Sequence, residues 1–433
     1  MNWKWKPKDA SGHASDSNNV CKQKPNAPAE FSRLSGERLV HRRTHPMQLR
    51  TGVGMIELQV LHGQDPADKP WGCPVREPWG LTGHQQPSLA LEDKLAFTIT
   101  ATASYEEAAA VAEKWGVPVT DSALHSLAQR LGQRAEARTQ EQLETSPGER
   151  QPERAPTPLA VLMLDGWQVR QRGPGWGKKR TQEPRVEWHE WKTGVYSRQE
   201  QAGRTAGGRG VLAETIVIGW QGDPLEFGRR LHWEALRGGL SRARAKLVVA
   251  DGAPWIWNVA QDRWAGATEV LDFYHASQHL GDLGRALQDD DEAATAQRVE
   301  PRRHQLRHGR EQQVPAEIAG LKVPRGEAGW VVQREQNYFA TQAGRMNDQS
   351  LHRRGWPIGS GPVESACRQR QCRFKRPGQF GTPKGMRHLS APTEARPPIT
   401  IGMNSGWQTK RGQCADAPAG APGLCPVLPV SRD

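Results

Sequence analysis

The sequence predicts a mixed α/β fold, in which helices flank a single sheet. Two apolar, β-branched runs, LAVLMLDG and KLVVADG, each end in Asp-Gly, which is the pattern of buried strands that end at a turn. Further strand-like and helical segments lie between and after these runs. A helix signature, PIGSGPVESACRQRQCRFKR at 357–376, follows them, and its Pro362 suits the first turn of a helix that Ser360 can cap.

The predicted elements follow a characteristic order. The helix that follows the third strand begins with an Asp cap, and a Trp-rich segment, WIWNVAQDRW, precedes the last strand. The expected strands are 159–165, 185–196, 211–220, 246–251 and 269–276, and the expected helices are 223–238 and 277–288. The order βββαβαβ, closed by the helix at 357–376, is that of a ribonuclease-H-like fold, whose sheet is mixed and carries helices on both faces.

Three acidic residues stand at the ends or starts of these elements. Asp165 and Asp251 each follow an apolar strand, and Glu364 lies in the first turn of an otherwise basic helix. Each has an ordinary explanation, because Asp-Gly is common turn chemistry and an acidic residue in a first turn offsets the helix dipole. If the three meet, their mutual repulsion raises their pKa values unless a hard divalent cation such as Mg²⁺ neutralises them.

Four motifs resemble bacterial insertion-sequence transposases of the DDE type, specifically the ISKra group, whose layout is similar to that of Mutator-like enzymes. The resemblance covers roughly 75–390, and LEDKLAFTITATASYEEAAAVAEKWG at 91–116 is also similar to that group. The motifs are LDGW at 164–167, VVADGAPWIWN at 248–258, LDFYHASQHL at 271–280 and the helix signature at 357–376.

The resemblance implies a reaction and a set of site residues. Asp165, Asp251 and Glu364 match the catalytic ligands of Mg²⁺ or Mn²⁺ in an enzyme that cleaves DNA strands at element ends and transfers them. Asp272 and His275 match the Asp-x-x-His signature, with His275 as a catalytic candidate and Asp272 as a secondary one. His275 is equally compatible with an imidazole hydrogen-bonded at a strand end. A Zn²⁺ site from Asp272, His275 and His279 is a weaker alternative, because it lacks cysteine ligands.

Composition favours a nucleic-acid partner. The formal net charge is +12 and the isoelectric point is near 9.6, which suits binding to phosphates. We expect double-stranded DNA as the partner, both the terminal inverted repeats and the target, bound by a homo-oligomer. Trp167, Trp255 and Trp257 are candidates either for stacking on a base or for the core. The expected DNA-binding residues are Arg368, Arg370, Arg373, Lys375, Arg376, Arg130 and Arg134.

The N-terminal part contains a pair of helical patterns. Ser104 to Glu107 is a capping box for a helix at 105–115, and a second helix extends from about 121 to 137. The pair fits either a DNA-reading helix-turn-helix or a plain helical hairpin. The predicted organisation is a poorly ordered segment at 1–75, a helical DNA-binding region at 76–140, a linker at 141–158, a catalytic domain at 159–287 and 356–390, a helical insertion at 288–355, and a disordered or aberrant tail at 391–433.

The sequence also bears on where the protein is located and on how far it keeps the family pattern. Neither a signal peptide nor an apolar run long enough to span a membrane is evident, so we expect a cytoplasmic, nucleoid-associated protein. The six cysteines form no Cys-x-x-Cys pair, which argues against a zinc ribbon. Beyond Leu389 the chain departs from the family. Two alternatives to an active transposase remain open. One is an inactive remnant that only binds DNA, and the other is a ribonuclease-H-like repair nuclease.

Overall fold

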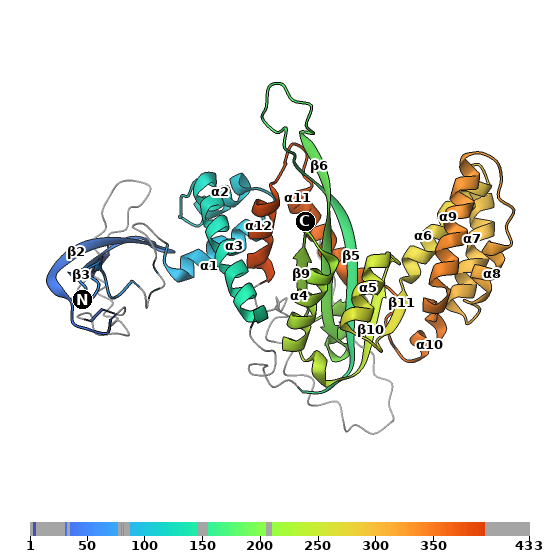
Figure 1. Ribbon diagram of the computed structural model, residues 1–433, viewed down its shortest axis with the longest axis horizontal. Coiled ribbons are helices and arrows are strands. Elements are labelled where there is room, and N and C mark those ends of the chain that lie inside the picture. The colour runs from blue at the N-terminus through green and yellow to red at the C-terminus, as the bar shows by residue number, and fades with distance from the viewer. Residues whose placement is uncertain are drawn as a thin grey trace, which may run out of the picture.

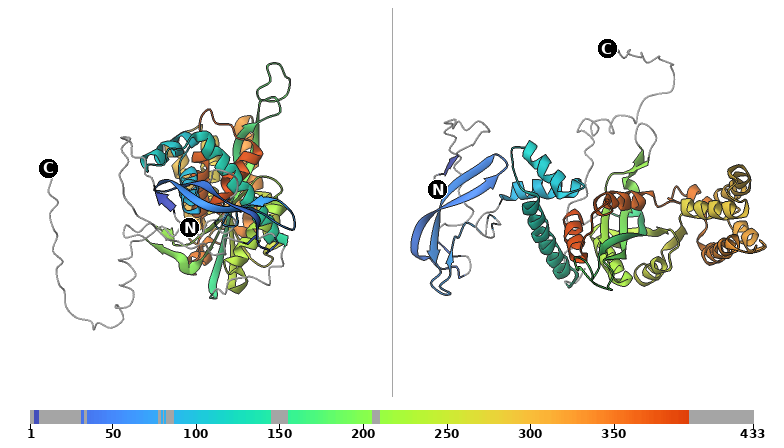
Figure 2. Two further views of the ribbon diagram at one scale, coloured as in Figure 1. Left: turned by 90° about the vertical axis from the view of Figure 1, so that its left-hand side faces the viewer. Right: turned by 90° about the horizontal axis from the view of Figure 1, so that it is seen from above.

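A computed structural model describes residues 3–5, 31–32, 35–76, 79, 81, 87–144, 155–204 and 210–394. Along the longest axis, strands from the N-terminal region come first, then a group of helices, a central sheet, and a second group of helices (Figure 1). The view from above shows the same succession (Figure 2). The predicted tail at 391–433 lies outside the described residues from residue 395 onward.

The central sheet has five strands in the order β11-β10-β5-β6-β9. Strand β5 pairs in parallel with β10 and antiparallel with β6, so the sheet is mixed. The strands are β5 (Thr157–Arg172), β6 (Val186–Arg198), β9 (Ile216–Trp220), β10 (Ala243–Ala250) and β11 (Thr268–Leu271). The prediction of a mixed sheet flanked by helices is therefore confirmed, and this sheet is compatible with a ribonuclease-H-like fold.

The two faces of the sheet bury alternate residues of β5. Leu162 and Leu164 pack on one face against helices α4 (Pro224–Arg237) and α5 (Pro254–Arg263). Val161 and Met163 pack on the other face against helix α11 (Gly361–Phe374). This period of two explains why the run reads as continuously apolar, because a strand covered on both faces needs no polar positions.

Several predicted boundaries are wrong. Strand β5 continues through Asp165 to Arg172, so Asp165 lies within the strand rather than at its end. Strand β11 ends at Leu271 and helix α6 (Phe273–Leu287) begins directly afterwards, because Asp272 caps that helix. The strand expected at 211–220 is divided into β8 (Gly210–Leu212), which pairs with β7 (Ala202–Arg204), and β9.

The N-terminal segment contains an antiparallel sheet that the sequence analysis missed. Strand β3 (Gly54–Gln64) pairs with β1 (Trp3–Trp5), β2 (Val40–Thr51) and β4 (Trp71–Gly72). Alternate residues of the hairpin, among them Met47 and Leu58, are buried in a small core with Val75. Strands thus lie within 40–72, part of the segment predicted to be poorly ordered, because apolar residues spaced by two among charged neighbours form a half-buried sheet.

Three helices follow: α1 (Leu89–Ala101), α2 (Tyr105–Lys114) and α3 (Asp121–Glu144). They share a core with the last described helix, α12 (Pro383–Glu394). Helix α3 extends into the predicted linker and β5 begins at Thr157, so both ends of that linker are regular structure, while its residues 145–154 lie outside the described part. DNA recognition by α2 and α3 stays a prediction.

A second helical group extends from the far edge of the sheet. It comprises α6 and the helices α7 (Glu292–Arg307), α8 (Gln313–Ala319), α9 (Glu327–Gln342) and α10 (Asp348–Arg353), and the first four share one core. The predicted insertion at 288–355 is helical in the structure, but its status as an insertion stays a prediction. No helix of the described ranges combines the length and apolarity needed to cross a membrane.

Candidate carboxylate site and nucleic-acid interface

Asp165 and Asp251 are brought together by strand pairing. In the parallel pair of β5 and β10, Leu164 is opposite Ala250, so the two acidic residues that follow occupy equivalent positions on neighbouring strands. Asp165 continues the odd-numbered residues of β5 that face α11, and Asp251 continues the alternation that points Leu247 and Val249 to this face. The two carboxyl groups therefore emerge side by side beneath α11.

The environment of Asp165 makes its charge costly. Burial raises the pKa of Asp165, and the nearby Asp251 carboxylate raises it further. A hydrogen bond from the Cys367 thiol and the proximity of His275 oppose this rise. Burial and the neighbouring Asp165 in turn raise the pKa of Cys367 to about 12. Cys367 therefore remains a thiol and donates a hydrogen bond to the Asp165 carboxylate.

Glu364 and His275 approach this pair from two helices. Glu364 lies in the first turn of α11, as predicted, although the Ser360 side chain makes no capping hydrogen bond. His275 Nε2 lies 3.9 Å from Glu364 Oε1, and Arg368 also lies 3.9 Å from the Glu364 carboxylate. His275 is also close enough to Asp165 to lower the pKa of that carboxyl group. His275 therefore contacts Glu364 and lies near Asp165, while the convergence of all three acidic residues stays a prediction.

Only part of this group of residues is arranged to bind a metal ion. Asp165 and Asp251 offer adjacent carboxylate oxygens, which are the donors that Mg²⁺ and Mn²⁺ prefer, and their repulsion is what a cation relieves. Within the described residues, however, no group of three or more His, Cys, Asp or Glu side chains is arranged to hold a metal ion. The pair therefore fits a cation, while Glu364 has to close on it to complete a three-carboxylate set. The arrangement of the described residues does not support the alternative Zn²⁺ site from Asp272, His275 and His279.

Asp272 holds the two helices of the site in place. One carboxylate oxygen accepts hydrogen bonds from the backbone N–H groups of Tyr274 at 2.6 Å and His275 at 2.9 Å, and the other accepts from the backbone N–H of Ser360. Asp272 is completely buried. The structure thus joins the start of α6 to the start of α11, and it shows a positioning role for this secondary candidate.

Helix α9 supports the turn that carries Asp251, which the sequence analysis did not foresee. The Tyr338 hydroxyl donates to the carbonyl oxygen of Asp251 at 2.8 Å, and the Gln342 amide donates to that of Gly252 at 3.0 Å. Burial and nearby carboxylates raise the pKa of Tyr338, so it stays a donor. These contacts span 87 and 90 positions of the chain, a separation at which local sequence patterns carry no signal.

The predicted DNA-binding residues of α11 fall into two groups. Arg368 has a side chain that is 81% exposed and is available to a ligand. Arg373 instead donates to the Ala103 carbonyl at 2.6 Å, and Arg376 pairs with Glu107 at 2.7 Å. Burial lowers the pKa of Arg373. Arg373 and Arg376 therefore join α11 to the N-terminal helices.

The remaining predicted contacts are also engaged within the chain. Arg130 and Arg134 both pair with Glu92 of α1. Lys375 lies 5.4 Å from the centre of the Trp167 ring, and Arg370 is partly buried. Trp167 and Trp257 are buried core residues, and Trp255 is partly buried against the core, which answers the choice between core and base stacking in favour of packing.

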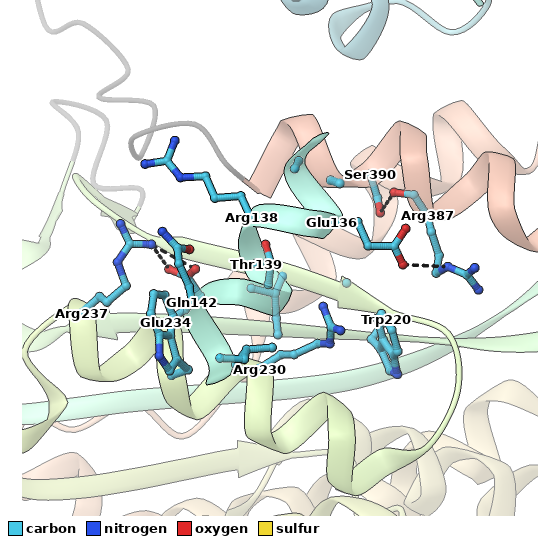
Figure 3. A pocket seen from close by; sticks show the side chains of 16 residues that line it. Glu136, Arg138, Thr139, Gln142, Trp220, Arg230, Glu234, Arg237, Arg387 and Ser390 are labelled. Carbon is cyan, nitrogen blue, oxygen red and sulfur yellow. Dashed lines mark hydrogen bonds and ion pairs between the residues drawn. The ribbon is translucent and has the colours of Figure 1, made fainter. Parts of the chain in front are cut away.

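A separate cavity of about 150 Å³ lies between α3, β9, α4 and α12 (Figure 3). Two ion pairs form among its lining residues, Arg387 with Glu136 at 3.5 Å and Arg237 with Glu234 at 3.1 Å. None of the three candidate acidic residues lines it. The cavity is therefore not part of the carboxylate site.

Comparison with known proteins adds little to this geometry. No protein-family model matches the chain, and no curated protein matches it either. One solved structure that resembles it is the Drosophila P element transposase strand transfer complex, with a TM-score of 0.34 and 10% sequence identity, covering 70% of this chain and 91% of that chain. A likeness this weak does not bear on function, which is argued below from the site alone.

Proposed function

We propose that this protein is a metal-dependent DDE-type transposase, which cleaves DNA strands at the ends of an insertion sequence and transfers them to a target. The observation that carries the proposal is the register of β5 and β10, which sets Asp165 and Asp251 side by side under α11. Asp165 is half-buried beside the Asp251 carboxylate, and its charge is costly unless a cation or a proton neutralises it. A phosphoryl-transfer site gives such a pair a use.

The chain's own residues have distinct tasks in this proposal. Asp165, Asp251 and Glu364 would hold Mg²⁺ or Mn²⁺, which when bound would activate the attacking hydroxyl or water and stabilise the leaving oxygen. His275, which lies 3.9 Å from Glu364 and near Asp165, would orient the scissile phosphate by donating a hydrogen bond. Arg368, on the exposed side of the same helix, would hold the flanking phosphates.

The partner in this proposal is double-stranded DNA, first the terminal inverted repeats and then the target. The net charge of +12 supports binding to phosphates. A homo-oligomer would allow both ends of the element to be held together. Membership of the ISKra group remains the prediction made from the four motifs.

A second candidate function is a catalytically inactive remnant that only binds DNA. The observation that favours it is the absence, in the described part of the chain, of three side chains gathered for a metal. In that case the basic surface would retain its affinity for DNA, while the carboxylates would bind no cation. The two candidates differ in their response to divalent metal.

The deciding experiment incubates the purified protein with DNA that contains its own coding region and flanks, in Mg²⁺ or Mn²⁺. The proposal predicts nicked or joined products that disappear with Asp251→Asn or Glu364→Gln. Asp262→Asn serves as the matched control, because Asp262 is an exposed acidic residue of α5 that pairs only with the adjacent Arg263. Binding without products in any metal supports the remnant, and cutting without preference for element ends supports a repair nuclease.

A further inference from the structure

The two strands of the carboxylate site continue beyond it as a projecting ribbon. Strands β5 and β6 stay paired from Asp165 opposite Thr193 as far as Arg172 opposite Val186. Residues 166–192 form this ribbon and its closing loop. Its inner part is buried, as Trp167, Val169 and Trp191 show, and its outer end extends past the helices that cover the sheet (Figures 1 and 2). We call this segment the β5–β6 ribbon.

The outer part of the ribbon carries a concentrated positive charge. Residues 170–185 contain six basic residues and one acidic residue, a net charge of +5 within a chain whose total is +12. The basic residues are Arg170, Arg172, Lys178, Lys179, Arg180 and Arg185. All of these except Arg170 are exposed. A surplus of this density is not needed for folding, since exposed like charges repel one another.

Acidic residues of the ribbon do not neutralise this surplus. Glu183 pairs with Lys178, and Glu190 pairs with Lys192 at 2.7 Å near the base of the ribbon. The side chains of Lys179 and Arg180 make no ion pair or hydrogen bond to another described residue. These two cations at the outer end are therefore free to meet an external anion.

The outer end is nevertheless a defined structure. The backbone N–H of Gly173 donates to the Arg185 carbonyl at 2.9 Å, and that of Gly175 donates to the Pro184 carbonyl at 3.1 Å. A Cβ atom on Gly173 would lie 2.3 Å from the Pro184 oxygen, so only glycine allows this closure. Trp176 packs on Phe380 of the α11–α12 connection with ring centres 4.9 Å apart. The cations are thus held on a braced support.

We propose that the β5–β6 ribbon is a DNA-binding arm that contacts the phosphate backbone of duplex DNA flanking the site of strand cleavage. This inference rests on the proposed function for the position of the cleaved bond. Arg172 lies seven residues beyond Asp165, about 23 Å along an extended strand. The outer cations therefore reach phosphates within about one helical turn, roughly 34 Å, of a bond held at Asp165.

Duplex DNA is the partner that the shape and chemistry of the ribbon fit best. A two-stranded ribbon is narrow enough to lie along a groove of duplex DNA, with its cations directed to the bordering phosphates. Lys179 and Arg180 present point and fork donors that recognise phosphate without reading bases. The arm therefore adds affinity that does not depend on sequence and that falls with salt.

The test compares two variants that lose the same charge. Lys179→Gln with Arg180→Gln removes the two unpaired cations of the arm, and Lys322→Gln with Arg325→Gln removes two exposed cations from the α8–α9 connection in the distant helical group. Both are made on Asp251→Asn protein, and binding to a 40-base-pair duplex of arbitrary sequence is measured in EDTA as a function of salt. Because no strand is cut under these conditions, failure of the proposed reaction does not affect the result.

The proposal predicts that the arm variant alone loses affinity and that its plot of log affinity against log salt becomes shallower by about 1.8, the slope of two released contacts. A benzophenone side chain introduced at the exposed Gln182 is expected to crosslink to the duplex. Equal losses from both variants, an unchanged arm variant, or absence of the crosslink would overturn the proposal. Stronger competition by duplex RNA than by duplex DNA would also overturn it, in favour of an RNA partner.

Discussion

Asp272→Ala offers the sharpest test of how the site is held together. The substitution removes the acceptor for three backbone N–H groups, two at the start of α6 and one from Ser360 before α11. Loss of a helix N-cap costs about 0.5–2 kcal/mol. The Ser360 N–H would also be left buried without a partner, at about 1–3 kcal/mol. The free energy of unfolding is therefore expected to fall by about 1.5–5 kcal/mol.

Asp291→Ala is the matched control for this prediction. Asp291 caps α7 with the same chemistry, accepting from Ala293 at 2.9 Å and Ala294 at 3.1 Å, but it is exposed and holds no second helix. Its loss is expected to cost only the cap, about 1 kcal/mol. Urea unfolding followed by tryptophan fluorescence measures both variants. If Asp272→Ala is no more destabilising than Asp291→Ala, the bond to Ser360 does not join the two helices and the reasoning fails.

Three further predictions follow from buried groups. Burial, then Glu311 and Asp272, raise the pKa of Asp348 to about 7. The stability that its protonated form contributes is complete below about pH 4 and is lost as the pH rises through about 7. The free energy of unfolding of Asp348→Asn should therefore exceed that of the parent by a few kcal/mol at pH 8, and should not exceed it at pH 4. Burial also raises the pKa of Asp165, so Asp165→Asn should stabilise the metal-free protein at pH 8. Mg²⁺ should raise the melting temperature of the parent but not that of the variant. Equal shifts of the melting temperature in both would contradict a cation at this residue. Tyr338→Phe removes the hydrogen bond to the Asp251 carbonyl and should lower the rate of strand cleavage more than the affinity for DNA. Tyr274→Phe, at an exposed tyrosine, should change neither the rate nor the affinity. An equal loss of rate in both variants would refute the support of Asp251 by α9.

The parts of the fold that could be predicted are those with a local signal. The apolar runs before Asp165 and Asp251 indicate strands because both faces of the sheet are covered, and the burial pattern of β5 and β10 has this origin. The proline and glycine near Glu364 likewise indicate the start of α11, where the structure places it. The outer half of β5 lies outside the predicted strand because its buried residues, Trp167 and Val169, alternate with polar residues and form no continuous apolar run.

The parts that could not be predicted depend on contacts between distant segments. Arg373 and Arg376 look like a DNA-binding surface in the sequence, but their partners at Ala103 and Glu107 lie about 270 positions earlier. The run EVLDFYHA at 269–276 predicts a strand through Asp272, whereas the side-chain bonds of Asp272 cap α6 and extend to Ser360. The support of Asp251 by Tyr338 has no local signature either.

The most direct test of the proposed metal site is anomalous diffraction from crystals of the protein with Mn²⁺ and a short duplex. The proposal predicts a peak between Asp165 and Asp251, at about 2.0–2.2 Å from a carboxylate oxygen of each, with Glu364 drawn toward it. The same measurement on Asp251→Asn should show the peak lost or strongly reduced. A well-ordered site without any peak at these residues, or manganese bound only elsewhere, would contradict the assignment of these carboxylates to metal-dependent strand cleavage.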